Sequence, residues 1–123
     1  MRDDIESRKD IERLVNAFYA KVKMDTTIGH YFTEVVNVNW EKHLPLMYDF
    51  WENVLFYRGN YAGNPMQKHL HIHQIQPIRK TEFMQWNKLF NETVDDLFEG
   101  GNAEIIKQRA QSISSVMQIK MME

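Results

Sequence analysis

The chain has 123 residues, 43% of them hydrophobic and 26% charged, a balance that predicts a single folded domain and excludes a disordered chain. Its formal net charge of −2 gives no electrostatic reason to expect a nucleic acid or an anionic membrane as a partner. The absence of cysteine excludes disulfides, thiolate metal sites and cysteine nucleophiles.

Apolar residues recur at helical spacing, and the chain contains only 5 glycines and 3 prolines, so we expect an all-α fold. The first long helix is predicted over residues 8–23. Its inward stripe has residues at three- and four-residue steps: Ile11, Leu14, Val15, Phe18, Tyr19 and Val22. Asp25 is then a candidate N-cap for a short turn of helix that carries Ile28, Tyr31 and Phe32.

A second long helix is predicted over residues 40–57, with Pro45 near its start, where a missing amide donor is tolerated. Its broad apolar face contains one histidine and consists of Trp40, His43, Leu44, Met47, Phe50, Trp51, Val54 and Leu55. Residues 58–77 are broken by glycines and prolines and can hold at most a short helix at 66–70. Three of the five histidines lie in this segment.

Two further helices complete the expected fold. One is predicted over residues 81–99, with Thr81 as its cap and an end at Gly100-Gly101. Its apolar side consists of Phe83, Trp86, Phe90, Val94 and Leu97. Asn102 is the expected cap of the last helix. The buried side predicted for that helix consists of Ile105, Ile106, Ala110, Ile113, Val116 and Met117.

The segment Gly63-Asn64-Pro65-Met66-Gln67-Lys68-His69 resembles the proximal segment of truncated haemoglobins of the third group. Nearly the whole chain is similar to that family in the order and spacing of further residues: Phe18-Tyr19, Trp40 with His43, Phe50-Trp51, Phe83 with Trp86, Leu89-Phe90 and Gln108-Arg109-Ala110. The resemblance implies one truncated globin domain over residues 1–123. It also implies a shortened two-over-two helical sandwich, in which helices crossing at large angles open a pocket.

The resemblance further implies a haem b, held without covalent attachment because the Cys-x-x-Cys-His motif is absent. His69 matches the iron-ligating histidine of the family, and Phe32 matches the aromatic residue that packs on the haem. The polar distal residues of the family are matched by Tyr19, His43 and Trp86. A buried phenol, imidazole or indole donor would stabilise the partial negative charge of a diatomic ligand.

Other residues complete the expected pocket. Met47 and Phe50 would keep it apolar, and the haem propionates could pair with Lys68, His71 and Arg79. The implied function is reversible binding of oxygen or a related diatomic ligand. Nitric oxide oxidation or peroxide chemistry, supported by a reductase, stays open. The charged N-terminus and the lack of an apolar stretch long enough to span a bilayer predict a cytoplasmic location.

Two other interpretations stay open from the residues alone. His69, His71 and His73 could form a non-haem metal site, although alternation by two places them on one face only in a strand. The chain could also be a helical interaction module that binds neither haem nor metal, with an exposed apolar patch to which its 8 methionines could contribute. Tyr19 and Trp86 would then be ordinary core residues. A histidine within an apolar face, as at His43, is the better single sign of a site.

Overall fold

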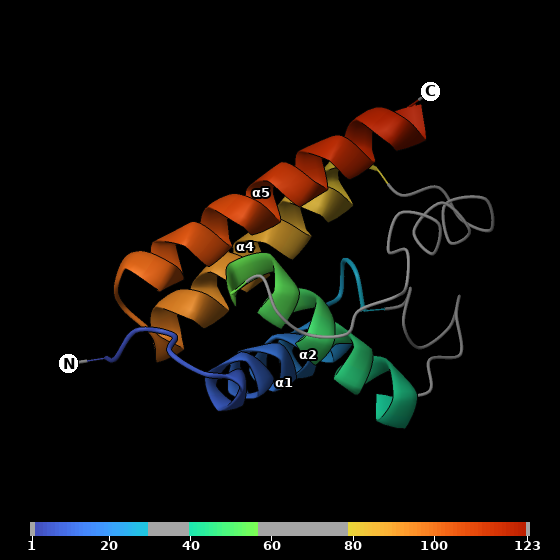
Figure 1. Ribbon diagram of the computed structural model, residues 1–123. Helices are drawn as coiled ribbons and strands as arrows, with labels where there is room; N and C mark the ends of the chain where they lie inside the picture. Colours follow the sequence, from blue (N-terminus) through green and yellow to red (C-terminus); the bar gives the residue numbers. More distant parts are fainter. Residues whose placement is uncertain (1, 30–39, 57–78, 123) are drawn as a thin grey trace.

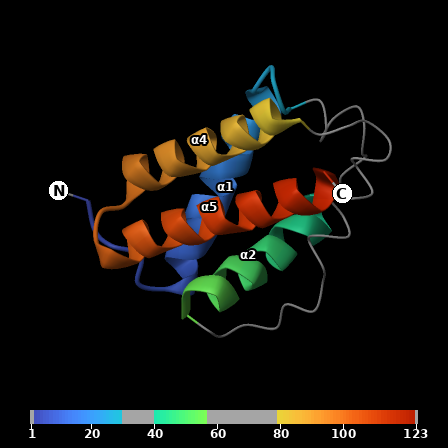
Figure 2. The same cartoon turned by 90° about the horizontal axis from the view of Figure 1, so that it is seen from above.

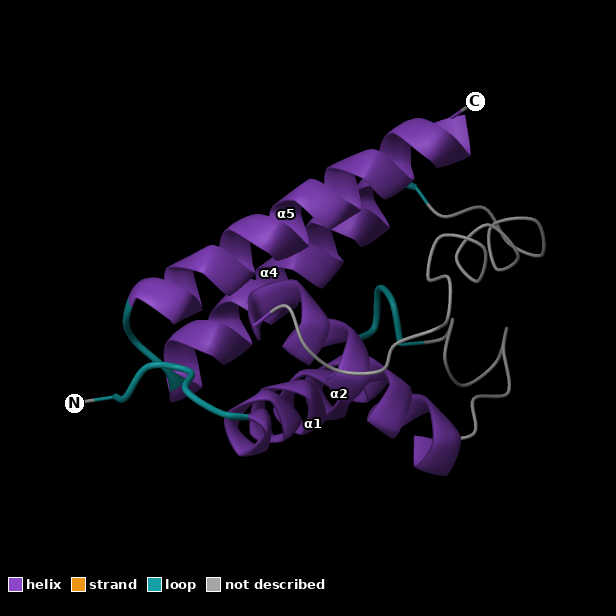
Figure 3. Ribbon diagram, viewed as in Figure 1, coloured by secondary structure: helices purple, strands orange, loops and turns teal. Residues whose placement is uncertain are grey.

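The structure is a computed structural model, and it describes residues 2–29, 40–56 and 79–122. Helix α1 spans Arg8–Met24, α2 spans Trp40–Phe56, α4 spans Lys80–Leu97 and α5 spans Gly101–Met122. Within these ranges the regular structure is all helical, as Figure 3 shows. The predicted all-α class is confirmed, and the predicted bounds of the first two long helices agree with α1 and α2 to within one residue.

The four helices form two antiparallel pairs that pack on one another (Figure 1). A short connection turns the chain between α4 and α5, so these two helices run in opposite directions side by side (Figures 1 and 2). Helix α1 packs against both α2 and α4, and α2 also contacts α5. This arrangement is the expected two-over-two helical sandwich.

The core lies where the two pairs meet, because each helix presents one apolar stripe to the others. All six inward positions predicted for α1 are buried. Phe90 of α4 is fully buried, and its ring stacks with those of Trp51 and Trp86, at centroid distances of 4.8 Å and 5.7 Å. The ring of Phe18 approaches that of Phe90 edge-on at 5.2 Å. Aromatic contacts therefore join α1, α2 and α4.

The caps predicted for the last two long helices are wrong. Helix α4 begins at Lys80, and the hydroxyl of Thr81 lies inside its first turn and donates to Glu82. Helix α5 begins at Gly101, and the backbone N–H groups of Asn102 and Ala103 donate to the carboxylate of Asp4. A carboxylate from the other end of the chain satisfies these amides, which a local sequence pattern cannot indicate.

Gly100, at the turn before α5, permits this remote cap. Its φ is +144°, a conformation that residues with a Cβ rarely adopt. A Cβ at Gly100 would also lie 2.5 Å from Cγ of Asp4. The glycine thus serves both the turn and the close approach of the N-terminal segment.

The predicted buried side of α5 needs a correction at two positions. Ile105 is 42% exposed and Val116 is 50% exposed. Small residues take the buried positions instead, since Ala103 and Ser114 are almost fully buried. Small side chains let two helices approach closely, and this preference outweighs the hydrophobicity of single residues.

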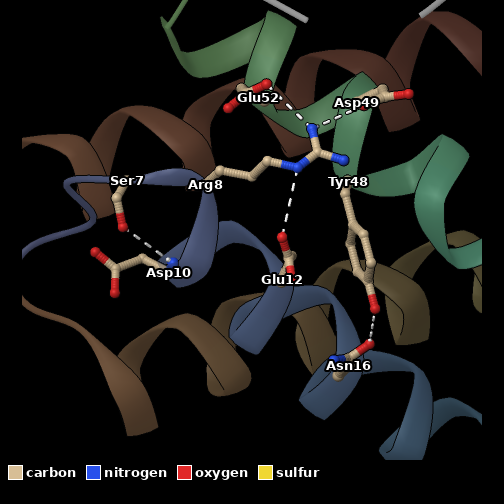
Figure 4. A network of polar contacts seen from close by, with 8 residues as sticks. All are labelled: Ser7, Arg8, Asp10, Glu12, Asn16, Tyr48, Asp49 and Glu52. Atoms are coloured by element: carbon tan, nitrogen blue, oxygen red, sulfur yellow. Dashed lines mark hydrogen bonds and ion pairs between the residues drawn. The ribbon is translucent and has the colours of Figure 1, made fainter.

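Charged residues join α1 to α2 near the start of α1 (Figure 4). Nη1 of Arg8 lies 2.7 Å from Oδ1 of Asp49 and 3.1 Å from Oε1 of Glu52. Nearby, the hydroxyl of Tyr48 donates to the side-chain oxygen of Asn16. The hydrogen bond to Asp49 raises the pKa of Arg8 above its ordinary value, although burial opposes this, and the hydrogen bond to Glu52 and the negative charges of both carboxylates raise it further. The buried Glu52, which the sequence did not indicate, is part of this network.

Among the described residues, no helix combines the length and the apolar character that crossing a membrane requires.

Candidate functional site

Tyr19 and His43 meet at the other end of the α1–α2 pair. Tyr19 lies near the end of α1 and His43 near the start of α2, and the antiparallel packing brings these two ends together. The hydroxyl oxygen of Tyr19 lies 3.4 Å from Nε2 of His43, and their rings make an edge contact at 5.4 Å. The tautomer of the imidazole decides which of the two groups donates. Tyr19 is buried and His43 is half-buried, so a hydroxyl and an imidazole lie next to each other within an aromatic cluster.

Trp40 and Lys23 adjoin this pair. The ring of Trp40 lies edge-on to the rings of Tyr19 and His43, at centroid distances of 5.3 Å and 5.6 Å. Nζ of Lys23 lies 4.0 Å from the centroid of the Trp40 ring, which is a cation–π contact. The sequence placed Trp40 on the apolar face of α2 and, with His43, among the residues that resemble the family, and it did not single out Lys23. The spacing of Lys23 four residues after Tyr19, on one face of α1, is the signal that could have found it.

The remaining predicted residues of α2 and α4 lie around the aromatic core. Met47 is buried one turn after His43, and Phe50 is half-buried with its ring edge-on to Trp51 at 5.0 Å. The half-buried Trp86 lies edge-on to Phe18 at 5.6 Å.

Phe18 connects Trp86 to the polar pair. Its ring also contacts that of Tyr19, at 5.2 Å, while it lies against Trp86 on α4. The structure thus brings Tyr19 and His43 together directly and relates Trp86 to them through Phe18. The sequence assigned Phe18 to the core stripe of α1 and gave no sign of this intermediate position.

Arg79 lies just before α4 and is well exposed. Its Nε lies 3.3 Å from Oε1 of Glu82, a carboxylate whose side chain is only 6% exposed. A glutamate in the first turn of a helix is favoured by the helix dipole, and this placement holds the Arg79 side chain at the start of α4. The burial of Glu82 has no counterpart in the sequence pattern.

Asp25 anchors the segment that follows α1. Its Oδ1 accepts hydrogen bonds from the backbone N–H groups of Thr27 and Ile28, and its Oδ2 accepts one from the side chain of Gln85. Burial alone would raise the pKa of Asp25, but the hydrogen bonds from Gln85, Ile28 and Thr27 outweigh it and lower the pKa below its ordinary value. The predicted capping role of Asp25 is confirmed for the turn at residues 26–29.

Several predicted site residues lie outside the described residues: Phe32, Lys68, His69, His71 and His73. The haem ligand assigned by resemblance and the alternative site of three histidines both fall there. In the described ranges, no group of three or more histidine or acidic side chains is arranged to hold a metal ion.

Comparisons with known proteins agree on one family. The group 3 truncated hemoglobin ctb of Campylobacter jejuni subsp. jejuni is 31% identical over 121 residues, which make up 96% of this chain and 93% of that protein. A crystal structure of the group III truncated hemoglobin from Campylobacter jejuni superposes with a TM-score of 0.85 at 30% identity and covers 98% of this chain and 95% of that chain. No protein-family model matches the chain.

Proposed function

This chain belongs to the truncated haemoglobins of group III, and from that premise we propose that it is a haem-binding globin that reversibly binds oxygen or another diatomic ligand. We propose one globin domain over residues 1–123 and a non-covalently held haem b with His69 as its iron ligand. When bound, this group would supply a ferrous iron that can bind a diatomic gas.

The donor set of the described residues fits the distal side of such a group. Tyr19, His43 and Trp86 carry a phenol, an imidazole and an indole, each of which can donate a hydrogen bond. The distance of 3.4 Å between the hydroxyl of Tyr19 and Nε2 of His43 is the observation that carries the proposal. Donors held in apolar surroundings stabilise a partial negative charge better than donors in water, because they need no reorganisation.

The apolar residues of the site have the complementary task. Met47 and Phe50 on α2 would exclude water and so limit oxidation of the iron, while Phe32 and Lys68 are further proposed haem contacts. Arg79 is a proposed partner for a propionate, and its exposed guanidinium would have to share its charge with Glu82.

Visible absorption spectra test this function. The native protein, mixed with one equivalent of hemin, reduced and exposed to carbon monoxide, should develop a sharp ferrous-carbonyl band, and His69→Ala should weaken or alter this band. His73→Ala is the matched control, because it removes an imidazole four residues away that the proposed haem site does not use. Absence of hemin binding by the native protein would contradict the proposal and leave the non-haem metal site and the helical interaction module as the alternatives.

Peroxide or nitric oxide chemistry is a second candidate function. The contact between two proton-bearing side chains, Tyr19 and His43, favours it, since such a pair can hold and deliver a proton. This chemistry would need an electron donor, for which we propose a cellular reductase. The cytoplasmic location of the protein is likewise a proposal. Turnover of peroxide or nitric oxide by the reduced, haem-loaded protein, compared with Tyr19→Phe, would separate this activity from ligand storage.

A further inference from the structure

Trp40 and Lys23 lie between the Tyr19–His43 pair and solvent. Tyr19 is 8% exposed, Trp40 is half-buried and Lys23 is exposed. The rings of Tyr19, Trp40 and His43 contact one another edge-on in all three combinations. The ammonium group of Lys23 then lies over the ring of Trp40 at 4.0 Å. These four side chains are layered from the core to the surface.

The two helices contribute two residues each. Tyr19 and Lys23 lie four residues apart on α1, and Trp40 and His43 lie three residues apart on α2, so each pair occupies one helical face. Trp40 touches both members of the polar pair as well as the lysine. The imidazole of His43 is therefore bordered by the phenol on α1 and by the indole on its own helix.

The distance between Tyr19 and His43 makes the geometry of this pair sensitive to the position of the Trp40 ring beside it. At 3.4 Å, the contact between Tyr19 and His43 is at the long end of hydrogen-bond distances, and a small rotation of the imidazole would break it. Edge-to-face ring contacts have preferred orientations, and a cation over an indole adds electrostatic attraction at the outer face. A fixed Trp40 ring thus limits the orientations that His43 can adopt.

We propose that Trp40, held by Lys23, is a positioning residue for the distal donors. Trp40 acts through His43 and Tyr19, whose rings its own ring contacts. This inference rests on the proposed function, because it concerns how firmly the donors of that site are held.

Oxygen dissociation from the reduced, haem-loaded protein measures the effect. Loss of part of one hydrogen bond predicts dissociation about 3- to 10-fold faster in Trp40→Ala and about 2-fold faster in Lys23→Met. Lys23→Arg keeps a cation over the ring and should restore the native rate, which a purely structural role of the lysine stem would not require. Lys9→Met removes an exposed lysine elsewhere on α1 and should leave the rate unchanged.

A spectroscopic readout checks the stack itself. In the carbon monoxide form, ring currents of Trp40 should shift the ε-methylene protons of Lys23 upfield, and Trp40→Ala should abolish the shift. The C–O stretching frequency should move in both Trp40→Ala and Lys23→Met, because it reports the polarity beside the ligand.

The outcomes distinguish the two proposals. Native carbonyl spectra with unchanged dissociation rates in both Trp40→Ala and Lys23→Met would overturn the positioning role and leave the proposed function standing. Failure of Lys23→Arg to restore the rate would also overturn it. Failure of the native protein to bind hemin would overturn the proposed function and the positioning role together.

Discussion

The two ends of the α1–α2 pair are held together by different chemistry. At one end, Arg8 forms ion pairs with Asp49 at 2.7 Å and with Glu52 at 3.1 Å. At the other end, aromatic rings surround a polar contact of 3.4 Å between Tyr19 and His43. The first end satisfies its charges within the helix pair. The second places two polar groups, a phenol and an imidazole, among aromatic rings at the long end of hydrogen-bond distances.

The largest effect is expected from Tyr19→Phe. This change removes the phenol donor but keeps the ring, so oxygen dissociation should become about 10- to 100-fold faster while the free energy of unfolding changes by less than about 1 kcal/mol. Stopped-flow measurement of dissociation and urea unfolding would check both parts.

Tyr48→Phe is the matched control for this change. It removes the same hydroxyl at the Arg8 end, where it donates to Asn16, and should leave dissociation unchanged. Equal rates of oxygen dissociation in the native protein and in Tyr19→Phe would contradict the role of the Tyr19 hydroxyl as a donor to the bound ligand.

Arg8→Met is expected to show the opposite pattern. Asp49 and the buried Glu52 would lose their shared cation, which should lower the free energy of unfolding by about 1–2 kcal/mol, a value reduced for the partial exposure of Arg8. Oxygen dissociation should not change. Urea denaturation gives the stability, and stopped-flow kinetics gives the rate.

Lys21→Met provides the comparison for Arg8. Its ion pair with Asp96 is more exposed on the carboxylate side, so its removal should cost less than about 0.5 kcal/mol. A larger loss in Lys21→Met than in Arg8→Met would show that the charged network of Figure 4 is not what holds this end.

A smaller effect than that of Arg8→Met is expected in acid, through Asp4. Burial would raise the pKa of its carboxyl, but hydrogen bonds from Asn102, Ala103 and Ile5 outweigh burial and lower the pKa below its ordinary value of 3.8. A carboxylate with a lowered pKa contributes its full stability above that ordinary value and loses it as the pH falls through the folded-state pKa. Asp4→Asn should therefore lower stability by about 1 kcal/mol near neutral pH and flatten the decline in acid.

Urea midpoints measured from about pH 6 to about pH 3 would check this dependence. Asp25→Asn is the parallel variant near the Tyr19 end, since the pKa of Asp25 is lowered as well. Identical acid profiles for native protein and Asp4→Asn would contradict the role of Asp4 as the cap of α5.

Local patterns predicted well wherever local physics decides. The apolar stripe of α1 and the bounds of α1 and α2 follow from three- and four-residue spacing, which a helix turns directly into one face. Thr81 and Asn102 failed as caps because competing partners exist: Thr81 bonds to Glu82, and Asp4 reaches α5 from 98 and 99 residues away in the sequence. Local propensity cannot weigh a partner that only the fold supplies.

The candidate site divides in the same way. The sequence by itself determined the all-helical class, the resemblance to the family, and the inward placement of Tyr19, because spacing and residue type contain that information. Only the tertiary structure decided that Tyr19 meets His43, that Lys23 covers Trp40 and that Glu52 is buried beside Arg8. These contacts join different helices, and their distances depend on how the antiparallel pair packs, which no single helix specifies.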